Sequence, residues 1–248
     1  NIIGNVNLTP ELTTEYEIGT EIRFLKDRIG LDIAYYNKRT KGQILNVPIA
    51  PSTGYQSAVA NFGLIENKGI EIAFNISPVK TRDFTWNINY TFTKNKNTVL
   101  DLPDGLDKVD FNSSYDIKMV ARVGYPVGII EAPTKIITDE GKYVVSAATG
   151  MFAQSPEDGV YGNIQRDYMM GLNNNFIYKN WSLGINLDYR KGGVFVSRTA
   201  DLQYFTGNAW LTQYNDRKPF IIPNSVVQTG VDPSGKPVYA ENTTAVDM

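Results

Sequence analysis

Glu15, Glu17 and Glu21 occupy odd positions of one short run, a spacing that would bring their carboxylates together on one side of a strand, as acid–base catalysis requires. Paired carboxylates carry out acid–base hydrolysis, for example of glycosidic bonds. Alternate residues of a β-strand, however, point to the same face of a sheet, and a polar strand face needs no catalytic role. We therefore interpret these carboxylates as one side of a strand and predict no catalytic residue.

Histidine and cysteine are both absent from the 248-residue chain. Their absence excludes disulfide bonds, zinc sites built on Cys or His, and nucleophiles activated by His. We expect no cofactor-binding or metal-ligating residue, and we expect the protein not to be an enzyme. The net charge of −2 and the scattered basic residues also argue against a surface that binds nucleic acid.

Acidic and glycine-rich stretches elsewhere are interpreted as turns. The run Asp101–Asp107 resembles a calcium-binding loop but lacks the ligand spacing and the terminal Glu of an EF-hand. Asp139–Gly141 and Asp232–Gly235 fit hairpin turns within long loops. Gly124–Gly128 carries no Lys followed by Ser or Thr, so phosphate binding is not expected.

Several aromatic residues outside the regular segments could stack on sugars, contact a protein partner, or pack the loops against one another. The sequence favours loop packing for any one of them, and no substrate-binding residue is assigned. These aromatic residues are Tyr55, Phe62, Tyr115, Tyr125, Tyr204, Phe205 and Trp210.

Six segments provide the framework that holds these residues. Each segment alternates apolar and polar residues with a period of two, as β-strands do. In the clearest segment, apolar or aromatic residues occupy every even position from Phe84 to Phe92, and Thr or Asn occupies every odd position. Asn174 is a single lapse in the fifth segment. The segments are 15–24, 29–36, 68–77, 84–93, 168–178 and 181–190.

The length of these segments distinguishes a membrane barrel from a soluble sheet. A tilted strand crosses a bilayer in about 9–11 residues, whereas strands of soluble sheets are usually about 5–6 residues long. Aromatic residues lie near the ends of the apolar stripes, where a membrane interface would be. The pattern predicts an all-β fold, an antiparallel transmembrane β-barrel.

The connections predict the orientation of this barrel. Short turns join the segments in pairs, at 25–28, 78–83 and 179–180, whereas the remaining stretches, 37–67, 94–167 and 191–248, are long. Bacterial outer-membrane barrels have short periplasmic turns and long extracellular loops. We therefore expect the three long stretches to be extracellular loops of a protein located in the outer membrane and in contact with its lipid.

Six strands are too few to close such a barrel, because the smallest have about eight strands and large transporters about 22. An open sheet edge in lipid would leave backbone groups without hydrogen-bond partners. We therefore expect the chain to be incomplete or to pair with other polypeptide.

The order of the sequence motifs resembles that of SusC-like TonB-dependent outer-membrane transporters, the RagA/SusC family of Bacteroidetes. The resemblance spans nearly the whole chain and depends on the order and spacing of the motifs together. The motifs are Asn7–Gly19, Asp32–Thr40, Asn61–Gly63, Glu66–Glu71, Arg122–Gly128, Gly162–Gln165 and Asp188–Gly193.

This resemblance implies active import across the outer membrane, driven by TonB through a segment on the N-terminal side of this chain. It also implies a SusD-like surface lipoprotein as a lid, an oligosaccharide or peptide substrate, and a roughly 22-stranded barrel. It explains Glu15, Glu17 and Glu21 as lumen-facing groups that hydrogen-bond a plug. The family's plug and closing strands are expected to be absent from this chain.

Two alternative functions remain open. A passive porin or structural barrel would share the strands, and a plug and TonB-contacting segment before Asn1 would distinguish the importer from it. A soluble β-sandwich that binds carbohydrate would share the alternation, but it would fold as a soluble protein without detergent.

Overall fold

A computed structural model describes residues 1–103, 106–114 and 116–247 of the chain. The fold is all-β with mostly antiparallel strands, one α-helix and short 3-10 helices in the described ranges. Its elements are β1 (Ile2–Ile3), β2 (Leu12–Phe24), β3 (Ile29–Pro48), η1 (Pro51–Thr53), β4 (Ser57–Lys80), β5 (Phe84–Asp101), β6 (Lys108–Ser114), β7 (Ile117–Arg122), β8 (Ile129–Ala132), β9 (Tyr143–Val145), β10 (Gly159–Asn163), β11 (Tyr168–Tyr178), β12 (Trp181–Lys191), α1 (Arg198–Phe205), η3 (Trp210–Arg217), β13 (Ser225–Val231) and β14 (Pro237–Glu241).

The chain divides into two compact units. Unit 1 comprises Asn1–Glu131 and Tyr161–Val194, and unit 2 comprises Ala132–Val160 and Phe195–Met248. The six alternating segments all lie in unit 1.

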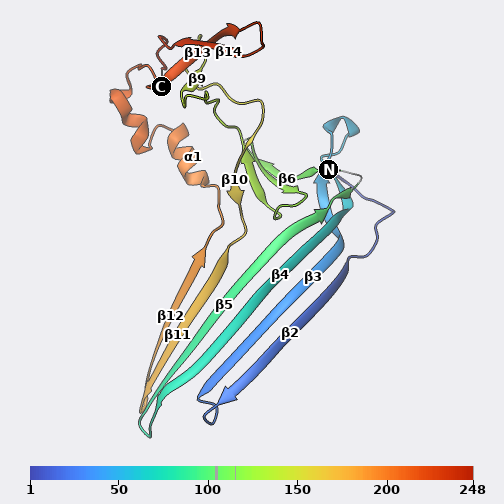
Figure 1. Cartoon of the computed structure of the whole chain (residues 1–248), viewed down its shortest axis with the longest axis vertical. Coiled ribbons are helices and arrows are strands. Elements are labelled where there is room, and N and C mark those ends of the chain that lie inside the picture. The colour runs from blue at the N-terminus through green and yellow to red at the C-terminus, as the bar shows by residue number, and fades with distance from the viewer. Residues whose placement is uncertain (104–105, 115, 248) are drawn as a thin grey trace. The chain divides into compact units, whose positions relative to one another are not determined.

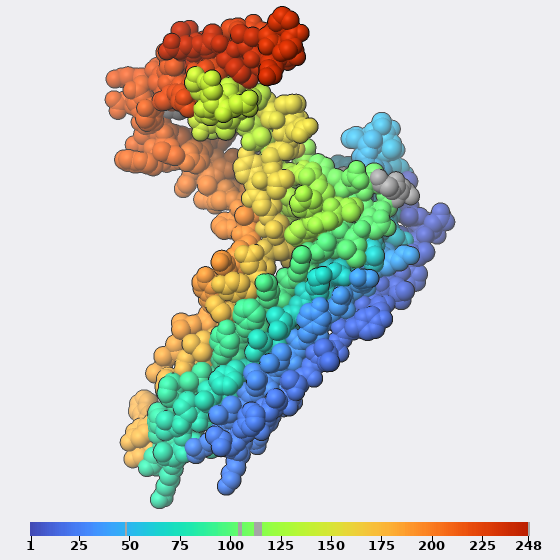
Figure 2. Space-filling view, viewed as in Figure 1, coloured from blue at the N-terminus to red at the C-terminus, as the bar shows by residue number. Residues whose placement is uncertain are grey.

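Unit 1 is built on a seven-stranded sheet with the order β12-β11-β5-β4-β3-β2, and β1 pairs in parallel with β4. The long strands run antiparallel and lie side by side as a continuous wall (Figures 1 and 2). In the described part of the chain the sheet does not close on itself, since β2 and β12 each pair with a single strand. It is therefore an open barrel wall.

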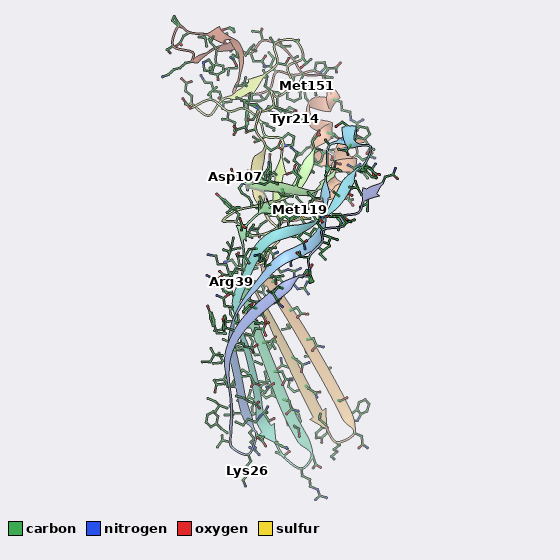
Figure 3. All side chains as sticks on the ribbon, turned by 90° about the vertical axis from the view of Figure 1, so that its right-hand side faces the viewer. Lys26, Arg39, Asp107, Met119, Met151 and Tyr214 are labelled. Carbon is green, nitrogen blue, oxygen red and sulfur yellow. The ribbon has the colours of Figure 1, made fainter. Side chains whose placement is uncertain are left out.

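Tight turns connect the long strands at one end. Leu25, Lys26 and Asp27 take left-handed backbone conformations between β2 and β3, as does Lys179 between β11 and β12. Such turns match the right-handed twist of the strands that they join. Figure 3 shows Lys26 at the tip of the β2–β3 turn and Arg39 farther along β3.

The strands of this sheet are longer than the alternation predicts. β3 continues to Pro48, β4 begins at Ser57 and β5 continues to Asp101, so parts of the stretches expected as loops, 37–67 and 94–167, are strand. The ladder persists in the register Lys38↔Asn67 and Asn67↔Asn97. The stretches 37–43 and 94–98 are polar throughout, so the hydrogen-bond ladder passes through them without the apolar stripe that makes a strand visible in sequence. Farther along, the same strands carry core residues such as Phe62 and Val99.

A second sheet of four strands has the order β10-β8-β7-β6. Its strands β6 and β7 contribute to the main hydrophobic core of unit 1, together with residues of β4 and β5. The buried members of this core are Phe62, Ile65, Val99, Leu102, Val109 and Ala121. Close packing also explains Gly63, where a Cβ would overlap the backbone carbonyl of Asp101.

Unit 2 contains a three-stranded sheet with the order β14-β13-β9, and α1 and η3. Its small core is formed by Val145, Ile222 and Val246. Ser197 caps α1 through its side-chain oxygen, which accepts a hydrogen bond from the backbone N–H of Ala200. Within the described ranges, no helix has the length and apolar character needed to span a membrane.

Candidate functional site

The strand register of unit 1 gathers polar side chains on one face of the sheet, here called the polar face. Asn75, Asn89, Asn173 and Asn186 occupy directly opposed positions on β4, β5, β11 and β12. The Asn89 amide donates to the Asn173 side-chain oxygen at 3.2 Å, and the Asn173 amide donates to Asn186. Asn89, Asn173 and Asn186 are thus hydrogen-bonded in a row across three strands, an arrangement that the sequence indicated only as Asn at alternate positions.

The opposite face, here called the apolar face, exposes large hydrophobic side chains. Ile18 on β2 is 75% exposed, and Leu183 and Leu187 on β12 are each 58% exposed. A monomeric water-soluble protein rarely exposes apolar residues in such a continuous array. The face needs an apolar environment, and a bilayer provides one.

Aromatic residues mark two levels of the apolar face. At the end away from the tight turns, the Tyr168 ring lies 5.8 Å from that of Phe92 and 6.1 Å from that of Tyr189, measured between ring centroids. Near the tight turns, Trp86 and Phe176 stack at 5.5 Å. Two such bands are typical of the girdles at the interfaces of a membrane barrel.

Asn174, the polar residue that interrupts the apolar stripe of β11, has a hydrogen-bond partner. Asn174 lies opposite Ile88 of β5, and its side-chain oxygen accepts a hydrogen bond from the indole N–H of Trp86 at 3.2 Å. A polar group in an apolar environment is costly unless it is hydrogen-bonded. The Trp86–Asn174 pair therefore reconciles Asn174 with a lipid-facing position.

The acidic residues that opened the sequence analysis lie on the polar face. Glu15 and Glu17 pair in register with Lys38 and Tyr36 of β3, and every residue of β2 is solvent-exposed. Glu21 forms an ion pair with Arg23 at 2.5 Å. The structure thus places these carboxylates on an open sheet face, and their catalytic inactivity remains a prediction.

Glu66 on β4 is the centre of a charged cluster above the segment 68–77. Its side chain is only 8% exposed and forms ion pairs with Arg39 at 2.8 Å and Lys68 at 3.2 Å. Asn37 donates a further hydrogen bond to its carboxylate at 3.5 Å. Hydrogen bonding by Arg39 lowers the pKa of Glu66 below its usual 4.5, and Lys68 acts in the same direction.

A network of side-chain amides links the polar face to the Gly124–Gly128 loop. The amides of Asn95 and Asn97 donate to the Asn67 oxygen at 3.0 and 2.9 Å. The oxygen of Asn97 accepts from the backbone N–H of Val127 at 2.8 Å. The loop is therefore held against the sheet, which accounts for its sequence motif without a ligand.

A second buried carboxylate stabilises the smaller sheet. Glu131 on β8 is 1% exposed and forms ion pairs of 2.8 Å with Lys108 of β6 and Arg122 of β7. Burial of a carboxylate requires such pairing. Sequence patterns could not reveal these ion pairs, because Lys108, Arg122 and Glu131 belong to three separate strands.

The expected hairpin turns are present. Thr138 accepts from the Gly141 N–H at 2.8 Å across the first turn. In the turn between β13 and β14, the Asp232 carboxylate accepts from the N–H groups of Ser234 and Lys236 at 2.8 and 2.9 Å. These bonds and one from the Ser234 hydroxyl, the largest cause, lower the pKa of Asp232.

The candidate aromatic residues have different environments. Phe62 is fully buried and packs on Phe111 at 5.2 Å, so it belongs to the core. Tyr125 is about half exposed, with Arg122 lying over its ring. Phe205 and Trp210 in unit 2 are 86% and 83% exposed, and Tyr55 and Tyr204 are also exposed. Tyr115 lies outside the described residues.

Metal binding was not expected, and the part of the chain that the structure describes contains no group of three or more potential ligands from His, Cys, Asp and Glu. The run Asp101–Asp107 lies partly outside this described part.

The matching family model is that of the TonB dependent receptor-like β-barrel, and it covers residues 1–125. The chain belongs to this family. The resemblance to SusC-like transporters is confirmed by curated relatives, of which TonB-dependent receptor P3 of Formosa agariphila is 26% identical over 218 residues, covering 79% of this chain and 22% of the relative. TonB-dependent receptor SusC of Bacteroides thetaiotaomicron is 28% identical over 196 residues, covering 74% of this chain and 20% of the relative. The chain therefore spans about a fifth of the length of these relatives.

Solved structures show the same fold. The structure of the RagAB peptide transporter matches with a TM-score of 0.58 and 15% identity, covering 73% of this chain and 21% of the other. The RagAB peptide importer in its 'open-open' state matches with a TM-score of 0.56 and 18% identity, covering 75% of this chain and 21% of the other. The prediction of an all-β barrel fold is thus confirmed, with the barrel not closed within the described residues.

Proposed function

We propose that the chain forms part of the wall of an outer-membrane barrel that imports nutrients with energy supplied through TonB. The observation that carries this proposal is the division of the wall into a polar face and an exposed apolar face, with aromatic bands at two levels of the apolar face. Family membership adds the link to TonB.

The substrate and partners follow from the resemblance and the relatives. SusC-like transporters imply a SusD-like surface lipoprotein as a lid, a plug that fills the lumen, and contact with TonB through a segment preceding the barrel. Oligosaccharides and peptides are both proposed as substrate classes, and the structurally similar RagAB is a peptide transporter.

The first test asks which face meets lipid. Leu187 and Asp188 are neighbours on β12 but belong to opposite faces, so Leu187→Arg and Asp188→Arg introduce the same charge on the two sides. A charge on the lipid face near the bilayer midplane costs about 2–4 kcal/mol. We expect the amount of heat-resistant folded barrel in outer-membrane fractions to fall in the L187R variant and to stay unchanged in the D188R variant. Equal loss in both variants would contradict the proposal.

The second test separates active import from a passive pore. Uptake of a labelled oligosaccharide or peptide by cells that make the full-length protein is compared with and without functional TonB. Active import predicts that uptake disappears when TonB is absent or the proton-motive force is collapsed. Uptake that survives both treatments would establish the porin function instead.

A further inference from the structure

The apolar face continues, past its aromatic band at Tyr168, into a group of cations. Lys94 and Lys96 follow Phe92 at alternate positions of β5, so they lie on the same face of the sheet as that ring. Lys191 of β12 is paired in register with Tyr168, and its ammonium lies over the tyrosine ring, 5.9 Å from the centroid. These cations and two from β3 and β4 are here called the outer cationic patch. The patch consists of Arg39, Lys68, Lys94, Lys96 and Lys191.

The strand register concentrates positive charge in this patch. Lys68 of β4 and Lys96 of β5 lie directly opposite each other in the ladder. Lys94 lies two residues from Lys96 and is opposite Ile70. Like charges at directly opposed positions destabilise a sheet. An anion bound between these ammonium groups would offset the repulsion.

The carboxylate of the patch is already in use. Glu66 forms ion pairs with Arg39 at 2.8 Å and with Lys68 at 3.2 Å. In the part of the chain that the structure describes, no ion pair joins Lys94 or Lys96 to a carboxylate, and both residues are exposed. The acidic residues of β2 lie on the polar face and cannot neutralise them. The patch therefore keeps an excess of positive charge.

The position of the patch along the strands corresponds to the level of lipid headgroups. Lys94 lies ten residues along β5 from its first residue, Phe84, and a tilted strand crosses the hydrocarbon in about 9–11 residues. Arg39 likewise lies far along β3 from the turn residue Lys26 (Figure 3). The aromatic band at Tyr168 is typical of the membrane interface. In a membrane-spanning wall, the ammonium groups thus lie just outside the hydrocarbon, on the lipid-facing side.

A ligand of this surface must match an apolar region and a cationic region together. Phe92, Met170 and Leu172 continue the apolar face from the patch toward the tight turns. Acyl chains pack on such a surface, whereas a phosphate accepts charge-assisted hydrogen bonds from ammonium groups. A free anion would leave the apolar region uncovered. A lipid with a phosphate-bearing headgroup supplies both parts in one molecule.

We propose that the outer cationic patch binds a phosphorylated lipid of the outer leaflet. The phosphate lies between Lys68, Lys94 and Lys96, and the acyl chains lie along the apolar face. This inference rests on the proposed function only in requiring that the wall spans the outer membrane with this end outward. It adds a lipid site that the transport of a nutrient does not itself require.

Native mass spectrometry of the full-length protein in detergent tests this site, with lipid A as the phosphorylated probe and its dephosphorylated form for comparison. We expect the dephosphorylated form to bind at least about tenfold more weakly, because it offers no anion to the ammonium groups. The double variant Lys94→Gln and Lys96→Gln is expected to weaken lipid A binding about twentyfold, roughly fivefold for each ammonium removed.

The matched control is the double variant Lys80→Gln and Lys179→Gln, which removes the same charge from exposed positions at the tight-turn end of the wall. It should leave lipid A binding unchanged. Replacement of both patch residues by arginine, Lys94→Arg and Lys96→Arg, keeps the charge and should retain binding. If circular dichroism shows that K94Q/K96Q is unfolded, the comparison of the two lipid probes on the wild-type protein decides.

Three results would overturn the proposal: equal binding of the two lipid probes, displacement of lipid A by an equimolar amount of inorganic phosphate, or equal weakening in the control variant. Absence of lipid A binding while L187R and D188R still differ would refute the patch alone. Uptake that persists without TonB, in a protein whose lipid binding depends on Lys94 and Lys96, would refute active import alone.

Discussion

Glu66 and Asn174 show how single polar residues are accommodated in a wall that presents an apolar face. Glu66 is nearly buried and has two cationic partners on the neighbouring positions Arg39 and Lys68. Asn174 faces the apolar side and has the Trp86 indole as its donor. In both cases the polar group is retained because a neighbour on the same or an adjacent strand satisfies it.

The pairing of Glu66 predicts a pH dependence of stability. Because its pKa is lowered in the folded state from the usual 4.5, the ionised form stabilises the fold fully above that value. This contribution is lost as the pH falls from 4.5 through the lowered pKa. We expect the urea midpoint in detergent to fall across this window in the wild type and to fall less in Glu66→Gln. Glu157→Gln is the exposed control, and an unchanged slope in E66Q would contradict the assignment.

A double-mutant cycle can measure the free energy that the Trp86–Asn174 hydrogen bond contributes to stability. Trp86→Phe leaves the Asn174 amide without its partner, and Asn174→Leu leaves the indole N–H without its acceptor. Each single change is expected to lower the free energy of unfolding in lipid vesicles by about 1–3 kcal/mol. The double variant should lose less than the sum, with a coupling of about 0.5–1.5 kcal/mol. Strict additivity would mean that the bond is not formed in the membrane.

At the scale of elements, alternation predicted where the long strands lie but not where they end. β11 and β12 follow the predicted ranges closely, at Tyr168–Tyr178 and Trp181–Lys191. β3 and β4 extend far beyond theirs because pairing continues through the polar stretch 37–43, where the apolar alternation is interrupted, and on to core residues such as Phe62. The charged clusters around Glu66 and Glu131 depend on register between strands distant in sequence, which periodicity within one segment does not reveal.

Gly69 of β4 is closely packed against both neighbouring strands. A Cβ at this position would overlap the backbone carbonyl oxygen of Lys94 on β5 and would lie 2.7 Å from the Tyr36 hydroxyl oxygen of β3. That hydroxyl donates to Asn95 at 3.1 Å. Gly69→Ala is expected to displace Tyr36 and the Lys94 backbone and to lower the free energy of unfolding by about 1–3 kcal/mol.

The control for this prediction is Gly184→Ala on β12, where a Cβ would meet no heavy atom within 4 Å. Urea unfolding in detergent should therefore show a loss of stability in G69A and little change in G184A. Similar midpoints for the two variants would show that the close packing at Gly69 does not require a glycine.

At the scale of the whole molecule, the wall and the unit 2 loops are expected to meet different environments. The tight turns between long strands lie at one end of the wall, and the stretches that lead into unit 2 leave from the other. If the wall spans the outer membrane, the turns face the periplasm and unit 2 faces the medium. Because these 248 residues contain no cysteine, a cysteine introduced into them adds a single new thiol that tests this arrangement.

Single cysteines at Arg82, in the turn between β4 and β5, and at Met151, an exposed residue of unit 2, report on the two sides. In intact cells that make the full-length protein, a membrane-impermeant maleimide is expected to label Met151→Cys and not Arg82→Cys. Permeabilising the outer membrane should expose the second position, because the reagent then reaches the periplasm. The full-length protein without the introduced cysteine controls for labelling elsewhere. Labelling of Arg82→Cys alone in intact cells would reverse the orientation, and labelling of both would mean that the strands do not separate two compartments.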